Sequence, residues 1–264
     1  MRSRLPRLTE FKGRSVRVVS RFSGAGVIIA LWFVATSFSW VDSLFLPSPI
    51  AVVKAIGQLF VKHNFLSDIL ATLYRLVVGF GIGAVSGVSV GMVVGYYRKL
   101  FDVLEFPLDF ARSIAVATLA PLFVLVFGLG DASKFAIAAW SSSLIILFGT
   151  LKGVQNCRKT RIMAARTMGT KRGRLFVRVI LPEALPEILV GLRQGASIAI
   201  IVVVLSEMIL GGSPVGLGQR VLNESLQYHV DAMYGAIIFA GILGFAINKF
   251  FAFIERRVVH WAGK

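Results

Sequence analysis

Few side chains in this 264-residue chain have the types and spacing that catalysis or metal binding requires. The three histidines, His63, His229 and His260, are far apart, and Cys157 is the single cysteine, so neither a metal-ligand motif nor an intrachain disulfide is expected. The sequence also lacks a G-x-x-x-x-G-K-[ST] phosphate loop and an H-E-x-x-H motif. We therefore expect no enzyme activity, no ATP hydrolysis by this chain alone and no cofactor bound in it.

The most informative segment is a strongly basic loop, residues 153–186, between two apolar runs. Within it, residues 160–168 have the composition of a helix, and Gly169 is suited to a helix end. A short helix that projects between two membrane spans has the geometry of an element onto which another protein docks.

The second half of this loop is also basic, over residues 171–178. Leu175, Phe176 and Val179 lie there at helical spacing, which predicts an apolar face on the membrane surface or on a partner. Pro182 and Pro186 are expected to break the chain before the next span.

Charged residues inside apolar runs are costly in a bilayer, so each one needs an explanation. Glu207, beside Ser206, lies near the end of an apolar run. It either faces a water-filled solute path or holds a loop by hydrogen bonds. Arg75 and Arg193 lie near the ends of their runs, where a long side chain can reach the membrane surface.

A row of glycines recurs every four residues in one of the apolar runs. Small residues at this spacing allow two helix backbones to approach closely. The row is compatible with close packing inside the chain and with a helix that must slide or rock against its neighbours. Its members are Gly79, Gly83, Gly87, Gly91 and Gly95.

The elements that position these residues are predicted to be membrane spans. The chain is 56% hydrophobic and only 16% charged, with a mean hydropathy of +0.78, whereas soluble domains have about 25% charged residues. Disorder and a soluble fold are both excluded by so much apolar surface. A span needs roughly 20 apolar residues. Six stretches qualify or nearly qualify: 24–40, 71–97, 106–127, 135–151, 188–210 and 232–254.

The net charge of +16 reports on topology rather than on nucleic acid, because the basic residues lie between the spans. With six spans, 21 lysines and arginines fall on one side and four on the other, which places both termini in the cytoplasm. We therefore expect a basic cytoplasmic segment 1–23, a transmembrane domain 24–254 and a cytoplasmic tail 255–264. Span 24–40 is interpreted as a retained anchor, and Ser48-Pro49 predicts a short outer helix over 49–62.

The basic loop resembles the EAA loop of ABC-importer permeases, whose pattern is EAA, three residues, G, nine residues and I-x-L-P. Met163 stands where the family has its acidic residue, and Arg158-Lys159 stands where relatives often have Asp-Pro. The resemblance assigns these residues to the ATPase-coupling loop: Met163, Ala164, Ala165, Arg166, Thr167, Gly169, Leu181 and Pro182. Further matches to the nitrate, sulfonate and taurine branch are 46–49, 72–75, 119–122, 127–130, 191–193, 206–208 and 255–257.

This resemblance implies an all-α permease of the type I importer fold in a bacterial inner membrane. It implies a homodimer with the solute path at the two-fold axis, two copies of a separate ABC ATPase that binds the ATP, and a periplasmic or lipid-anchored solute-binding protein. The loop would sit in a groove of the ATPase, and the solute would be a small organic or inorganic anion such as a sulfonate, taurine or nitrate.

Other functions remain open at this point. The same fold can carry another solute, such as a pyrimidine precursor, bicarbonate or an aromatic acid. An ion-driven secondary carrier would need charges within the membrane and repeated halves, and a lipid-modifying membrane enzyme would need a polar catalytic set near the interface. Neither pattern is clear in the sequence.

Overall fold

A computed structural model of the chain describes residues 24–259, with the exception of 25, 39 and 63. The expected basic segment 1–23 and the last five residues of the expected tail lie outside the described residues. All the regular structure within the described part is helical.

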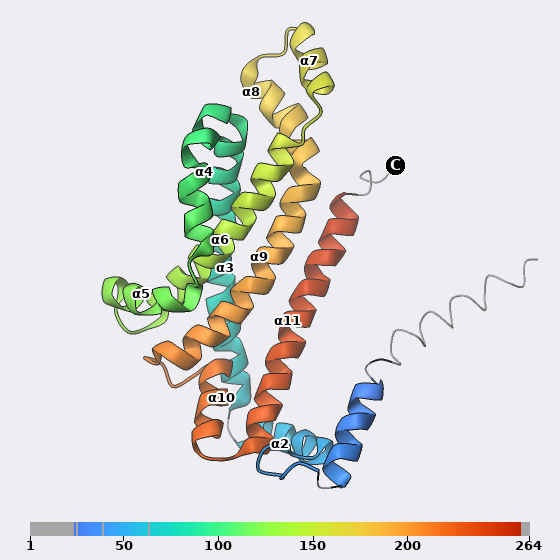
Figure 1. Cartoon of the computed structure of the whole chain (residues 1–264), viewed down its shortest axis with the longest axis vertical. Helices are drawn as coiled ribbons and strands as arrows, with labels where there is room; N and C mark the ends of the chain where they lie inside the picture. The colour runs from blue at the N-terminus through green and yellow to red at the C-terminus, as the bar shows by residue number, and fades with distance from the viewer. Residues whose placement is uncertain (1–23, 25, 39, 63, 260–264) are drawn as a thin grey trace, which may run out of the picture.

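Three long helices lie side by side and form the centre of the molecule (Figure 1). They are α3 (Phe65–Tyr96), α6 (Asp131–Gln155) and α9 (Leu181–Leu210), and α11 (Val230–Val258) flanks them. At about 1.5 Å per residue, each of the four exceeds the roughly 30 Å of a bilayer's hydrocarbon core. The apolar side chains that face away from neighbours, such as Val85 of α3, are therefore positioned for contact with lipid.

The described residues contain four helices that are long and apolar enough to cross a membrane, or five if one bent pair is a single span. The four correspond to the expected spans at 71–97, 135–151, 188–210 and 232–254. Among the described residues of the expected first span, the apolar helix Gly26–Ser37 has 12 residues, which at about 1.5 Å per residue is less than the thickness of a bilayer's hydrocarbon core. Six spans are thus not reached within the described part of the chain.

The expected third span, 106–127, is wrong as a single helix. The chain forms α4 (Arg98–Ser113), a 3₁₀ turn (Val116–Leu119) and α5 (Ala120–Phe127), with a bend of 89° between the two halves. Ile114 and the residue after it are extended, and Pro121 lies in the first turn of α5, where its missing N–H is not needed. Hydropathy measures how apolar a stretch is and does not detect this break.

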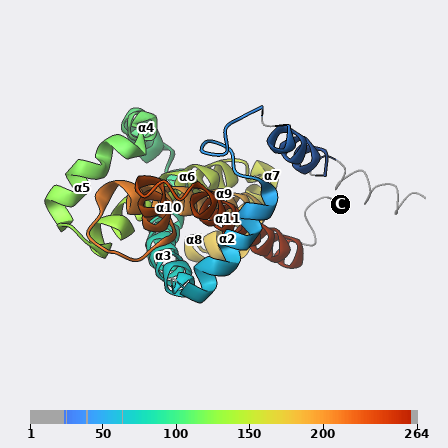
Figure 2. The same ribbon diagram turned by 90° about the horizontal axis from the view of Figure 1, so that it is seen from below.

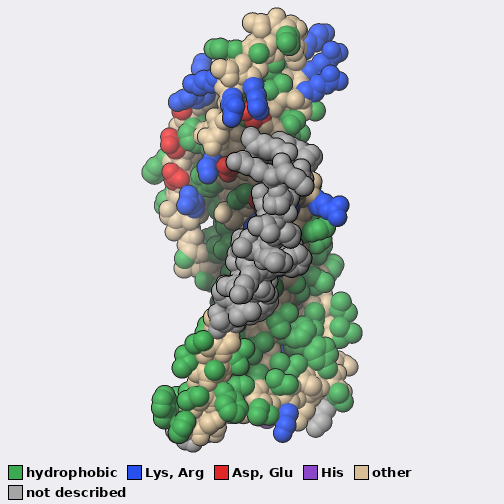
Figure 3. All heavy atoms as spheres, turned by 90° about the vertical axis from the view of Figure 1, so that its right-hand side faces the viewer, with side chains coloured by type: hydrophobic (Ala, Val, Ile, Leu, Met, Phe, Trp, Pro, Cys, Tyr) green, Lys and Arg blue, Asp and Glu red, His purple; other side chains and the backbone are tan. Residues whose placement is uncertain are grey.

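The two ends of the bundle differ in character. At one end α7 (Lys159–Thr167) and α8 (Arg172–Leu175) form the tip, and Figure 3 shows lysines and arginines gathered there. At the other end lie α10 (Leu217–Leu226) and the expected short helix, α2 (Pro49–Lys62), which crosses beneath the bundle in Figure 2. The Ala51 N–H donates to Ser48 Oγ at 3.2 Å and so caps the start of α2.

Candidate functional site

The helix expected in the basic loop is confirmed as α7, and Gly169 ends it. Gly169 has a φ of +74°, a conformation that glycine adopts without steric cost. The Gly169 N–H donates to Arg166 O, and the Thr170 N–H donates to Ala165 O. This pair of bonds is a Schellman motif, which satisfies carbonyls at the helix end and turns the chain back towards the membrane.

Two contacts fasten α7 to the bundle. At its start, the Glu183 carboxylate accepts from the Arg158 backbone N–H at 3.3 Å and from Arg161 Nη1 at 3.2 Å. Glu183 therefore supplies, from the beginning of α9, the negative charge that Arg158-Lys159 lacks at the helix N-terminus. Along its inner side, Ile162 and Ala165 pack on an apolar cluster of the bundle. The position of α7 is thus set by the body of the protein.

The opposite side of α7 faces away from the bundle. Thr160, Met163, Ala164 and Thr167 are all exposed there, and the Met163 side chain is 65% exposed. At 100° per residue these four positions share one face of the helix. The face is small and uncharged. Of the other residues matched to the EAA pattern, Arg166 and Pro182 are exposed, and Leu181 packs beside Ala165 on the apolar cluster.

The second half of the loop differs from expectation in two ways. Leu175 is buried in the chain's own apolar cluster, and Phe176 and Val179 are partly buried against it, so this apolar face packs on the bundle itself. The two prolines do not break the chain either, since one helical path runs from 173 to 210. Pro182 lies in the first turn of α9, and a π-helical segment, Phe176–Ile180, precedes it.

The glycine row lies against α6 along the whole contact. A Cβ added at any of its five positions would come within 3 Å of α6 atoms. At Gly87 it would lie 2.6 Å from Ser143 O and at Gly91 2.8 Å from Leu147 O. The letters of residues 87–91 also fit the G-x-S-x-G pattern of serine hydrolases. They lie inside a continuous helix, however, and not at the strand-to-helix turn that exposes such a serine.

At the other end of the bundle, a buried polar network joins α3, α6 and α9. Arg75 is 2% exposed and does not reach the membrane surface as expected. Its Nη1 donates to Glu207 Oε1 at 2.6 Å and its Nε to Asp131 Oδ1 at 2.8 Å. Two carboxylates from neighbouring helices hold the guanidinium inside, and a paired charge loses less by burial than a free one.

Glu207 holds a loop. Its side chain is 0% exposed, and its carboxylate accepts from Thr72 Oγ1 and from the Gly218 N–H at 2.9 Å. Arg75 also donates to Val215 O at 2.8 Å, so the turn before α10 is tied to α3 and α9. The adjacent Ser206 is buried and donates to Val203 O within its own helix. The solute-path role of Glu207 and Ser206 stays a prediction, and this geometry favours the loop-holding role.

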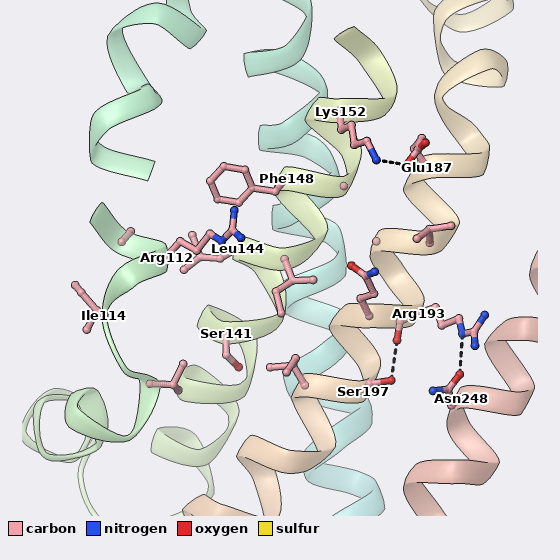
Figure 4. A pocket seen from close by; sticks show the side chains of 18 residues that line it. Arg112, Ile114, Ser141, Leu144, Phe148, Lys152, Glu187, Arg193, Ser197 and Asn248 are labelled. Atoms are coloured by element: carbon pink, nitrogen blue, oxygen red, sulfur yellow. Dashed lines mark hydrogen bonds and ion pairs between the residues drawn. The ribbon is translucent and has the colours of Figure 1, made fainter. Parts of the chain in front are cut away.

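A cavity of about 1020 Å³ lies between α4, α6 and α9, and Figure 4 shows the side chains around it. Arg112 points into it from the end of α4, with its guanidinium carbon 5.3 Å from the centroid of the Phe148 ring. Lys152 pairs with Glu187 at 3.7 Å. Arg193, expected to reach for the membrane surface, instead turns to α11, where its Nε donates to Asn248 Oδ1 at 2.7 Å.

The sequence did not identify this cavity or the partners of Arg75. Residues such as Asp131 and Glu207 are 76 positions apart, and nothing in their local spacing shows that they meet. The available signal was that Arg75, Arg112, Arg193 and Glu207 are charged residues inside apolar runs. Such residues are expected to point away from lipid, but their partners in the fold cannot be read from the sequence.

Comparison with known proteins places the chain among transport components. Residues 79–261 match the family described as binding-protein-dependent transport system inner membrane component. A probable ABC transporter permease protein of Brucella melitensis is 31% identical over 87% of this chain and 92% of its own length. A putative aliphatic sulfonates transport permease protein of Bacillus subtilis is 27% identical over 89% of this chain and 84% of its own length.

The fold also matches a solved structure. The MetNI methionine ABC transporter, in its inward-facing conformations, contains a chain that superimposes with a TM-score of 0.65 at 20% identity. The match covers 74% of this chain and 95% of that one.

Proposed function

The chain belongs to the family of binding-protein-dependent transport system inner membrane components, and we propose that its basic loop couples it to a separate ATPase and that it carries a small anion. Membership of this family makes it the multi-pass permease subunit of an ABC importer, a transport component rather than a catalyst. The identity of the coupling element and that of the solute are the proposals developed here.

The single observation that carries the coupling proposal is the placement of α7. The helix forms the tip of the bundle, its inner side is fixed by Glu183 and the apolar cluster, and its outer face is small, uncharged and exposed. A neighbouring groove can accept such a face without burying an unpaired charge. Basic residues around it, including Arg161 and Arg166, favour a groove with an acidic rim.

The same proposal fixes the orientation and the assembly. The end that carries α7 faces the cytoplasm of a bacterial cell, both termini are on that side, and residues 24–254 form the domain in the inner membrane. Two copies of the chain would flank the solute path, each with one ATPase that binds the ATP. A periplasmic or lipid-anchored binding protein would deliver the solute to the end formed by α2 and α10.

The relative described as a putative aliphatic sulfonates transport permease supports a small anion, with an aliphatic sulfonate as the first candidate solute. The solute that binds to a co-purifying solute-binding protein would test this candidate. Binding of bicarbonate, a pyrimidine precursor or an aromatic acid instead of a sulfonate would contradict it.

A pull-down tests the coupling proposal. Ala164→Trp puts bulk on the exposed face of α7 without touching the interior, and Leu226→Trp places the same bulky side chain on exposed surface at the other end. From native membranes in mild detergent, wild type and Leu226→Trp should retain a stoichiometric ATPase, and Ala164→Trp should lose most of it. An ATPase that stays bound to Ala164→Trp contradicts the role of α7. The absence of any ATPase, under conditions that keep a known importer intact, contradicts the coupling proposal itself.

A further inference from the structure

The charges around the cavity between α4, α6 and α9 do not cancel. Arg112, Lys152 and Arg193 line it, with Glu187 as the only carboxylate among its lining residues. Lys152 pairs with Glu187 at 3.7 Å, and Arg193 is offset from outside the lining by Glu255, whose Oε2 is 3.5 Å from its Nη1. One positive charge is left over.

That charge is on Arg112. Among the residues that the structure describes, no carboxylate lies within 4.0 Å of its guanidinium, and its closest defined partner is the ring of Phe148. Stacking on an aromatic ring leaves the N–H donors at the guanidinium edge available. Figure 4 shows Arg112 reaching from the end of α4 towards α6, next to Phe148 and Leu144.

The unpaired charge of Arg112 lies where a charge is costly. It stands at the end of α4, just before the 89° bend, in a segment that hydropathy counts as part of a membrane span. An arginine at membrane depth faces water or a partner and not lipid, because its transfer into lipid is costly. The surroundings are polar as well. Ser141, Gln194 and Ser197 line the cavity.

We propose that Arg112 is the anion-recognising residue of the solute path, and that its guanidinium binds the negatively charged oxygens of the solute as it crosses the cavity. A planar guanidinium presents paired N–H donors that match sulfonate, carboxylate or nitrate oxygens. Arg193 and Lys152 contribute less, because each already has a partner. This inference rests on the proposed function, since it needs the chain to form an anion path.

A labelling experiment tests the charge and the access of water together. Cys157→Ala removes the single cysteine, and Leu144→Cys then places a thiol on the cavity wall. Leu144 is one helical turn from Phe148 on the same face of α6, and hence near Arg112 (Figure 4). The thiolate reacts with a methanethiosulfonate to form a mixed disulfide and release methanesulfinate. The two probes are the anionic sulfonatoethyl reagent and the cationic trimethylammonioethyl reagent, used on the full chain in native membrane vesicles.

The expected result is a preference for the anionic reagent that depends on Arg112. Arg112→Gln should lower the ratio of anionic to cationic labelling rates by about fivefold or more, because one nearby charge acts on the two reagents in opposite directions. Arg193→Gln, and Lys249→Gln as a control cation outside this cavity, should each change the ratio by less than about twofold. Sodium ethanesulfonate should slow anionic labelling more than sodium chloride at equal ionic strength, and this excess should vanish in Arg112→Gln.

Four outcomes would overturn the proposal. They are no labelling by either reagent, a ratio that Arg112→Gln does not change, an equal effect of Arg193→Gln, and equal protection by chloride and ethanesulfonate. None of these readouts involves an ATPase. If the pull-down fails but labelling shows an anion-selective cavity, only the coupling proposal is contradicted. If the pull-down succeeds but labelling shows no role for Arg112, only the Arg112 proposal is contradicted.

Discussion

The contact between α3 and α6 leaves no room for a methyl group, and this predicts opposite effects for two glycines of the same helix. Gly87→Ala puts a Cβ 2.6 Å from Ser143 O and 3.0 Å from Ile146 Cβ. Gly81→Ala is the matched control, because nothing lies within 4 Å of its added Cβ. Both substitutions change helix propensity equally, so the difference in stability between the two variants measures the effect of packing alone.

The size of the effect follows from what must move. Ser143 O is a backbone atom of α6, so relief requires α6 itself to shift away from α3. On its other side α6 meets α9, where a Cβ on Gly149 would lie 2.8 Å from Gly191 Cα, so α6 cannot retreat. Overpacking of this kind costs about 1–3 kcal/mol. For a chain of this size, that corresponds to a fall of roughly 2–10 °C in the apparent melting temperature.

The assay measures thermal unfolding of the tagged chain in one detergent. After heating to a series of temperatures, the folded fraction is read from the size-exclusion peak. Gly87→Ala should melt below wild type, and Gly81→Ala should melt at or slightly above it, since alanine favours a helix by up to about 1 kcal/mol over glycine. A Gly87→Ala chain that is as stable as Gly81→Ala would refute the argument that the glycine row exists for close packing on α6.

Two further predictions concern buried polar groups. Arg75→Met should lower the apparent melting temperature more than Gly87→Ala does, because it leaves Glu207 buried without its 2.6 Å partner, and breaking such a pair costs about 3–5 kcal/mol. The double variant Arg75→Met/Glu207→Gln should recover part of the lost stability. No recovery would mean that the ion pair does not hold this region together. Burial raises the pKa of the Cys157 thiol to about 11, so at pH 8 only about 0.1% is thiolate. Maleimide labelling of the folded chain should thus be slow and rise with pH towards 11, while the chain in hot detergent labels fast; fast labelling of the folded chain at pH 8 would contradict its burial.

Hydrophobic length allowed the spans at 71–97, 135–151, 188–210 and 232–254 to be predicted, because a run of apolar residues must cross or be buried wherever it lies. The α7 helix and its end at Gly169 were also predictable, since a cap depends on residues close in sequence. The bend after Ser113 was not, because it depends on a few backbone angles inside a stretch whose average hydropathy is that of a span. The pairing of Arg75 with Glu207 was hidden for a different reason. It joins residues 132 positions apart, and only the packing of three helices brings them together.

The helical path from 173 to 210 connects the basic loop with the buried network around Glu207, which are separate features in the sequence. Leu175, at its start, lies in the apolar cluster that also holds α7, and Glu207, near its other end, holds the turn before α10. Along this path α9 touches α6 through glycines, as α6 touches α3, and interfaces this close shift as units because a dense core deforms little. If an ATPase moves α7, the motion therefore reaches the far end as a tilt of α3, α6 and α9 together. Helix α4 has no buried residue and carries Arg112 on the wall of the cavity, so its contacts are less constrained than the glycine contacts of these three helices.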